Sequence, residues 1–140
     1  MMVTIRGIPQ KYSSCKWHKN DEELKEMLNI HGTKIADGYG CTLLGNTNFL
    51  YEKKSKRHIM KAIIQLQETT EKLINANQPL DEVFIVCEAI SKPESGAYKR
   101  IIMKGKADKY LYDKNNKQYV TIAHNGKSFP IKLFYNHEVI

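Results

Sequence analysis

The sequence predicts an α+β domain in which a mostly antiparallel sheet packs against one long helix. Three patterns carry the prediction: two hairpins whose registers can be counted in the last third of the chain, a helical periodicity over residues 59–74, and a capping box that begins at Asn20. With 140 residues, the chain can bury about two thirds of its unfolded surface in one core. We therefore expect a single domain over residues 1–140.

The first part of the chain is predicted to hold short elements. Asn20 can cap a helix, with Glu23 three residues on to reach back to its amide, and Gly32 is placed to end that helix in a left-handed conformation. Earlier in the chain, Pro9 ends the strand expected at residues 3–8. The expected elements are a strand at 3–8, a loop at 10–19, a short helix from 21 to about 31, and a hairpin with strands at 40–44 and 48–52.

The long helix is the clearest single element. Its apolar residues recur at helical spacing, Ser55 can cap its start, and the turn cluster at 75–79 ends it at a proline that cannot continue a helix. Residues 83–90 follow, nearly all apolar except Glu88, and read as an interior strand. The long helix is expected to cover the core face of the sheet.

The two hairpins set the register of the C-terminal strands. Asn125-Gly126 is the strongest short hairpin signal, because both residues tolerate the positive φ of a type I′ turn. Counting outward from it pairs His124 with Lys127, Ile122 with Phe129, Val120 with Ile131, Tyr119 with Lys132 and Lys117 with Phe134. A second turn at 113–116 pairs Tyr112 with Tyr119, Leu111 with Val120 and Tyr110 with Thr121. Together with the strand at 83–90 the result is a four-strand meander.

These registers separate an apolar face from a basic, aromatic one. The apolar face collects Ile101, Met103, Ala107, Leu111, Val120, Ile122, Phe129, Ile131 and Leu133, with Lys109 out of place among them. The opposite face collects Arg100, Lys104, Lys106, Tyr110, Tyr112, Tyr119, Thr121, Lys132 and Phe134.

The second face predicts a surface for nucleic acid. Lysines attract phosphates, and a tyrosine ring can stack on any base of a single strand. The formal charge of +7 is concentrated over residues 51–64 and 99–140, which favours a polyanionic partner such as DNA or RNA. We expect a non-enzymatic binding protein that uses Tyr110, Tyr112, Tyr119, Lys104, Lys106 and Lys132, together with a basic cluster at Lys53, Lys54, Lys56 and Arg57.

Other interpretations stay open at this point. Tyrosine and lysine also decorate ordinary solvated strands, and the N-terminal segment could cover this face. The same face could bury into a protein partner, as in a small inhibitor of an enzyme. The positive charge of the basic cluster is unfavourable next to the positive end of the dipole of the long helix. The cluster is therefore either a site for a phosphate, which would relieve the repulsion, or a solvated loop.

An enzyme would use metal-independent RNA cleavage. Glu88 would be the base, Arg100 or Lys104 the stabilising cation, and His124 or His58 the acid. A helical half followed by an antiparallel sheet, with Glu, Arg and a late His in that order, resembles the arrangement of barnase-like ribonucleases. The resemblance covers topology and residue order, with no shared motif, and it implies a metal-independent ribonuclease.

The sequence favours no cofactor. Cys15, His18, His31 and Cys41 lack the paired spacing of a zinc finger, and the scattered glycines do not form a phosphate loop. Three widely spaced cysteines are typical of a reduced, cytoplasmic protein, and no apolar run approaches the length of a membrane span. We expect no metal and no membrane partner.

Overall fold

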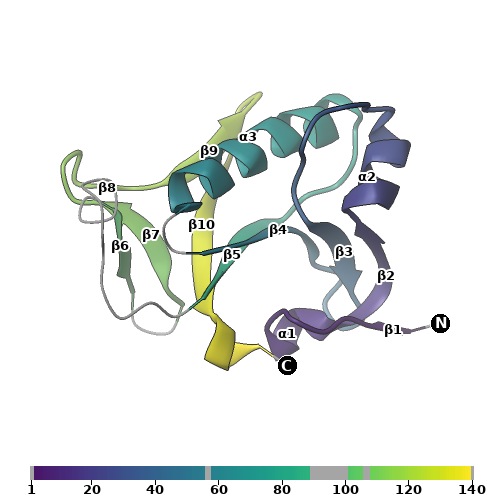
Figure 1. Cartoon of the computed structure of the whole chain (residues 1–140), viewed down its shortest axis with the longest axis horizontal. Helices are drawn as coiled ribbons and strands as arrows, with labels where there is room; N and C mark the ends of the chain where they lie inside the picture. Colours follow the sequence, from purple (N-terminus) through teal and green to yellow (C-terminus); the bar gives the residue numbers. More distant parts are fainter. Residues whose placement is uncertain (1, 56–57, 89–100, 106–107, 140) are drawn as a thin grey trace.

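The computed structural model describes residues 2–55, 58–88, 101–105 and 108–139 of the chain. One sheet runs through the molecule, with the two longer helices on one face and the N-terminal segment, which holds a short helix, on the other (Figure 1). The strands are β1 (Val3–Thr4), β2 (Ser14–Asn20), β3 (Gly38–Thr42), β4 (Asn48–Ser55), β5 (Glu82–Glu88), β6 (Ile101–Lys104), β7 (Tyr110–Asp113), β8 (Gln118–Tyr119), β9 (Thr121–His124) and β10 (Lys127–Tyr135). The helices are α1 (Gln10–Ser13), α2 (Asp21–Leu28), α3 (Ile59–Asn75) and the 3₁₀ turn η2 (Asn136–Glu138).

The sheet is mixed, which corrects the expected four-strand meander. Its strand order is β1-β2-β3-β4-β5-β10-β7-β6, with β8 paired to β7 and β9 paired to β10. β5 runs parallel to both of its neighbours, β4 and β10. The last strand therefore inserts between β5 and β7 instead of lying at the edge. Residues 83–87 are buried without a break, as expected for a strand covered on both faces.

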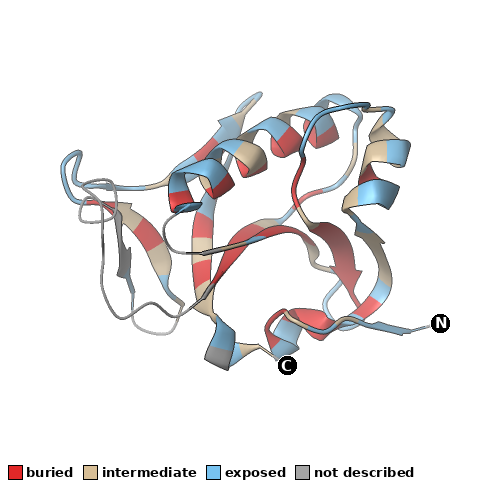
Figure 2. Ribbon diagram, viewed as in Figure 1, coloured by how far each residue is buried: buried red, intermediate tan, exposed pale blue. Residues whose placement is uncertain are grey.

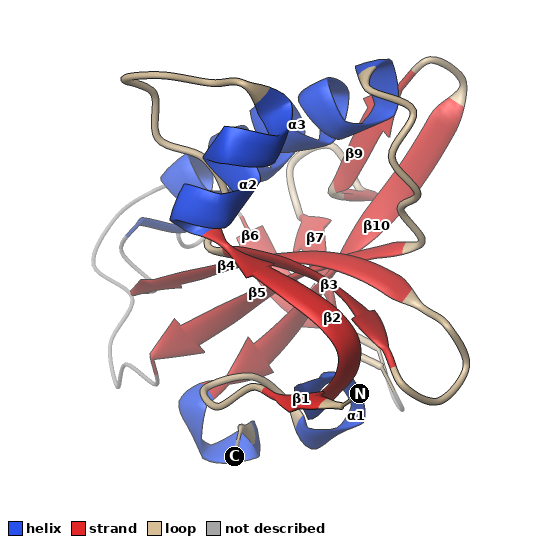
Figure 3. Cartoon of the chain, turned by 90° about the vertical axis from the view of Figure 1, so that its right-hand side faces the viewer, coloured by secondary structure: helices blue, strands red, loops and turns tan. Residues whose placement is uncertain are grey.

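Apolar layers cover the central sheet on both faces (Figures 2 and 3). On one face, α3 lies over Leu50, Ile85 and Leu133, as expected for the long helix. On the other face, Ile8 and Tyr12 of the N-terminal segment pack on aromatic residues of the sheet, and η2 closes the same side. Alternate residues of β4, β5 and β10 serve the two layers in turn.

Phe84 is the centre of the second layer. Its ring stacks on Tyr12 at 4.4 Å and on Tyr51 at 5.3 Å, and it meets Phe134 edge-on at 5.5 Å. All of Phe84 is shielded from solvent. The N-terminal segment thus covers Phe134, which the sequence placed on the open basic face.

Two glycines in β3 make room for this aromatic layer. A Cβ at Gly38 would lie 2.3 Å from the ring of Tyr51, and one at Gly40 would lie 2.8 Å from the ring of Phe49. Both distances are far below van der Waals contact, so each ring occupies the space that a side chain would need. The glycines at 38 and 40 are therefore packing residues of a strand.

The turn that joins β9 to β10 is confirmed, and its register holds for four pairs. His124 pairs with Lys127 and Ile122 with Phe129, and Asn125 and Gly126 both have positive φ. Tyr112 pairs with Tyr119 in the second hairpin, as expected. Leu111, Ile122, Phe129, Ile131 and Leu133 are buried on the helix face as predicted.

Beyond Val120 the counted register is wrong. The strand breaks there, and Lys132 pairs with Tyr110 instead of Tyr119. Tyr110 has Lys104 and Lys132 as its strand neighbours and not Thr121, and Phe134 pairs with Val86 of β5 and not with Lys117. The reason is that β10 exchanges one neighbour for another along its length. Counting from one turn cannot see that exchange.

The N-terminal elements are confirmed in part. Asn20 caps α2 with the expected box: its Oδ1 accepts the Glu23 amide at 2.9 Å, and its amide donates to Glu23 Oε1 at 3.0 Å. The helix ends earlier than expected, at Asn29 in a left-handed conformation. Residues 14–20 form β2 and not a loop, and β1 is much shorter than predicted. Ser55 belongs to β4, and His58 precedes α3 without a side-chain cap.

Candidate nucleic-acid interface

The predicted tyrosines come together on a hairpin at one side of the sheet. We call this unit the tyrosine hairpin: residues 104–105 and 108–121, which hold the end of β6 together with β7 and β8 (Figure 1). The Tyr119 ring meets Tyr112 edge-on at 5.2 Å and Tyr110 edge-on at 6.1 Å. Lys104 Nζ lies 4.1 Å from the centre of the Tyr112 ring. The three rings and one cation thus form a single array.

Tyr119 is the most open member of this array. It is 44% exposed, whereas Tyr110 and Tyr112 are half-buried. One face of Tyr112 is occupied by the Lys104 ammonium. Tyr119 and Tyr110 are therefore the rings best able to offer a π-face to a ligand.

A pocket of about 440 Å³ opens between these two rings. Its walls are Tyr110, Tyr119, Thr121 and Pro130, with Gly105 and Asp108 at the β6–β7 connection. The volume lies within the range of small-molecule pockets, which is about 300–1,000 Å³. It can hold one planar ring system, such as a nucleobase, against an aromatic wall.

The turn of the tyrosine hairpin is held by Asp113. Its carboxylate accepts the amides of Asn115 at 3.0 Å and Asn116 at 3.2 Å, and the Asn116 side chain donates to it at 2.9 Å. Lys117 takes a positive φ to complete the turn. This local network fixes β8 beside β7 and so places Tyr119 against Tyr112.

The charge around the rings is basic. Lys104, Lys109, Lys114 and Lys117 are all exposed on this hairpin, against Asp108 and the buried Asp113. The sequence assigned the last three of these lysines no role. Their positions in the sequence, in the β6–β7 connection and the β7–β8 turn next to the tyrosines, could have indicated that they belong to the same surface.

Lys132 does not contribute a free charge. Its Nζ donates to Glu82 Oε1 at 2.6 Å and lies 3.7 Å from Asp108. Burial lowers the pKa of Lys132, but the hydrogen bond and charge of Glu82 outweigh it and raise the pKa above its usual value. The same Glu82 oxygen accepts the Tyr12 hydroxyl at 2.8 Å. Lys132 therefore belongs to a network that ties the N-terminal layer to β5 and β10.

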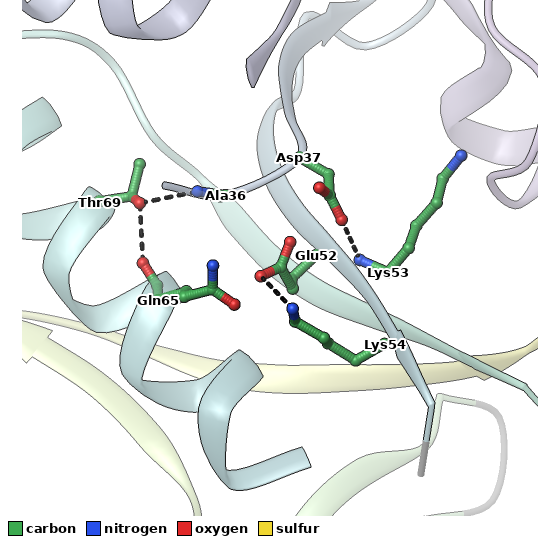
Figure 4. Close-up of polar contacts among 7 residues, drawn as sticks. All are labelled: Ala36, Asp37, Glu52, Lys53, Lys54, Gln65 and Thr69. Atoms are coloured by element: carbon green, nitrogen blue, oxygen red, sulfur yellow. Dashed lines mark hydrogen bonds and ion pairs between the residues drawn. The ribbon is translucent and has the colours of Figure 1, made fainter. Parts of the chain in front are cut away.

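Two residues of the predicted basic cluster, Lys53 and Lys54, belong to β4 and do not form one surface. Lys53 and Lys54 leave β4 on opposite sides, and the two side chains point apart in Figure 4. The Lys53 ammonium approaches Gly7 of the N-terminal segment, whereas Lys54 lies beside Glu52 near α3. Lys56 and Arg57 lie outside the described residues, as do Arg100 and Lys106 of the other predicted groups.

The described residues among those expected for RNA cleavage do not lie together. His124 Nε2 contacts Asn75 Oδ1 at 2.8 Å, at the C-terminal end of α3, whereas His58 precedes its first residue. A helix of 17 residues spans about 25 Å. The backbone of Glu88 pairs with Ser55, at the His58 end of the molecule. Glu88 and His124 therefore stand at opposite ends of the sheet.

Comparison of the chain with protein-family models, with curated proteins and with solved structures finds no match in any of the three. Among the described residues, no helix is long and apolar enough to cross a membrane. Nor does any group of three His, Cys, Asp or Glu in the described ranges come close enough to hold a metal ion.

Proposed function

We propose that this protein binds single-stranded nucleic acid through the tyrosine hairpin, without cleaving it. One base would stack on Tyr119 and enter the pocket beside Tyr110. The lysines at 104, 109, 114 and 117 would contact the flanking phosphates. The observation that carries the proposal is the pocket between two tyrosine rings on a hairpin whose exposed charge is basic.

Several features support stacking over a purely electrostatic contact. The described walls of the pocket include two tyrosines and a proline, and no lysine is among them. A base could therefore enter an apolar site while its phosphates remain near the ammonium groups. A single strand is favoured over a duplex, because its bases can splay out to reach a ring.

The test is fluorescence anisotropy with labelled single-stranded and duplex oligonucleotides of DNA and RNA, at two salt concentrations. We expect single strands to bind more tightly than duplexes, and the affinity to fall as salt rises through counterion release. Gel analysis of the recovered RNA should show intact strands. Cut RNA would contradict the non-enzymatic proposal.

A matched pair of variants separates stacking from charge. Tyr119→Ala should weaken single-strand binding by about 5- to 150-fold, the range that corresponds to one stacked base. Lys104→Gln should reduce both the affinity and its dependence on salt. Leu44→Ala, at a side chain that is 87% exposed in the distant β3–β4 turn, is the control and should change neither. Equal affinity for Tyr119→Ala and the parent chain would remove the stacking proposal.

A protein partner is the second candidate function. Among the described residues that line the pocket, Asp108 is the one that is charged; it is acidic, and its side chain is 45% exposed. A basic side chain of a protein could therefore enter beside it. Asp108→Asn distinguishes the two candidates, because loss of a negative charge should strengthen binding to an oligonucleotide and weaken binding to a basic peptide.

A further inference from the structure

A second site lies on the helix face of the sheet, away from the tyrosine hairpin. Its centre is Glu52 of β4, whose carboxyl is 1% exposed beneath α3 (Figure 4). Oε2 of Glu52 makes no hydrogen bond, and Oε1 of Gln65 and Oγ1 of Thr70 on α3 are likewise buried without a partner. Buried polar groups are nearly always paired in folded proteins, so each of these unpaired atoms invites an explanation.

Glu52 is held neutral by its surroundings. Burial is the main cause, and the hydrogen bond and negative charge of Asp37 add to it, so that the pKa rises to about 9 although Lys54 opposes the shift. Asp37 is itself engaged, since its Oδ2 accepts the Lys53 amide at 2.7 Å. At neutral pH the strand therefore carries a protonated acid next to Lys54.

Among the described residues, no ionised carboxylate is paired with Lys54. Its Nζ lies 4.0 Å from Glu52 Oε2, which is too long for a hydrogen bond, and only a quarter of its side chain is exposed. A neutral carboxyl cannot balance an ammonium group that is mostly removed from water. A half-buried cation of this kind is stabilised by an anion that can approach it.

An open cavity gives an anion access to Lys54. It has a volume of about 260 Å³ and lies between α3 and the loop that precedes β3. Its walls are Thr33, Lys34, Lys54, Lys61, Ile64, Gln65 and Glu68. The described lining includes three lysines and one glutamate, so its net charge is positive. Ile64, which is 54% exposed, and the lysine stems supply an apolar wall.

We propose that this cavity binds a small organic anion whose carboxylate or phosphate head contacts Lys54, Lys34 and Lys61 and whose apolar body lies on Ile64. Glu52 acts as a positioning residue. Because it stays protonated, it leaves the charge of Lys54 available to the ligand. Gln65 contributes an amide at the inner end of the cavity.

The first experiment is an NMR titration of the full chain with propionate, which has an oxyanion head and an apolar body, and with inorganic phosphate, which has the head alone. Saturable shifts of the Ile64 methyl groups are expected with propionate, and weaker binding with phosphate. The reverse order would assign the site to free phosphate. Shifts that do not saturate with either anion would overturn the proposal.

Charge-matched variants test the assigned cation. Lys54→Gln should weaken propionate binding at least tenfold. Lys72→Gln removes the same charge from an exposed position on α3, outside the cavity, and should leave binding unchanged. Equal losses in the two variants would show that binding depends only on overall charge, and would contradict a site at Lys54.

The role of Glu52 is read from the pH profile. As pH rises toward 9, ionisation of Glu52 should neutralise Lys54 and release the anion. The other described ionisable side chains at the site are Asp37, Glu68, Lys34 and Lys61. Glu52→Gln keeps the neutral form at every pH, so it should retain binding and lose this decline. Identical profiles for Glu52→Gln and the parent chain would overturn the positioning role. Should Glu52→Gln fail to fold, the Lys54 and Lys72 pair still decides whether the site exists.

Discussion

The central sheet and the tyrosine hairpin use the same residue types for different ends. In the central sheet, Tyr12, Phe49, Tyr51 and Phe84 pack together between β4, β5 and the N-terminal segment, where they are shielded from solvent. In the hairpin, the Tyr119 ring meets Tyr110 and Tyr112 edge-on, and Tyr110 and Tyr119 border an open pocket. The difference is whether a second layer covers the strands. Aromatic content alone therefore does not distinguish a core from a binding surface.

The largest expected effect comes from removing the centre of the covered layer. Phe84→Ala should lower the free energy of unfolding by about 3–5 kcal/mol, because it removes a fully buried ring that contacts four others. Tyr119→Ala should change the same quantity by less than about 1 kcal/mol. Urea denaturation of both variants measures the contrast. Similar losses would mean that the tyrosine hairpin is part of the core.

A smaller effect is expected from filling the space beneath Tyr51. Gly38→Ala should cost about 1–3 kcal/mol, since the new methyl group would overlap a ring that has no room to move. Ser128→Ala, at an exposed position of β10, is the matched control and should be close to neutral. Thermal unfolding of the two variants gives the comparison. A Gly38→Ala protein as stable as the control would show that the covered layer is loosely packed.

The next effect should stay local to the tyrosine hairpin. Asp113→Ala removes the acceptor of two turn amides and should cost about 1 kcal/mol, by analogy with the loss of a helix cap. Hydrogen exchange should quicken in residues 110–119 and remain slow in β5. Exchange that quickens equally in both regions would show that hairpin and sheet open as one unit.

Glu52 should also make the stability of the fold depend on pH. Glu52 is protonated in the folded state up to about pH 9, but in the unfolded chain it loses its proton near its ordinary pKa of 4.5. Between these values the unfolded state binds fewer protons, so stability should be highest at low pH and fall as pH rises through this window. Glu52→Gln should remove this part of the slope. Denaturation midpoints measured across the window decide the matter, and an unchanged slope would show that Glu52 is ionised in the folded chain.

Local signals predicted the short-range features well. The Asn20 capping box, the Asn125-Gly126 turn and the pairing of Tyr112 with Tyr119 are each fixed by residues close together in sequence. Alternation along β7 also placed Tyr110 and Tyr112 on one face. These features were predictable because turn geometry and side-chain alternation are properties of a few consecutive residues.

The neighbours of β10 could not be read from the same signals. Its first half pairs with β9 as expected, but β7 replaces β9 along the same edge at Lys132, and the opposite edge of its second half pairs with β5. Both choices depend on contacts across the whole chain. The uninterrupted apolar run at 83–87 was the available sign of a strand covered on both faces, and a strand, helix and strand in that order predicts a parallel pair. The counted pairs of Lys132 and Phe134 failed for this reason.

The candidate sites show the same limit. Tyr110, Tyr112, Tyr119 and Lys104 were found because they alternate on strands, whereas the pocket also depends on Pro130, which no sequence pattern assigned to that face. The burial of Glu52 follows from the position of α3 above β4. A single glutamate between a tyrosine and two lysines carries no sign of that burial in the sequence.

The place of β10 in the sheet has a consequence for synthesis. Because β10 is the inner neighbour of β5, the edge of β5 that it covers lacks its partner until residues 127–135 have left the ribosome. The nascent chain therefore carries an apolar, unpaired strand edge while the tyrosine hairpin is being made, and such edges invite pairing with other chains. Shortening the chain before β10 should leave a product that aggregates, and a slow ribosome should prolong the same vulnerable interval.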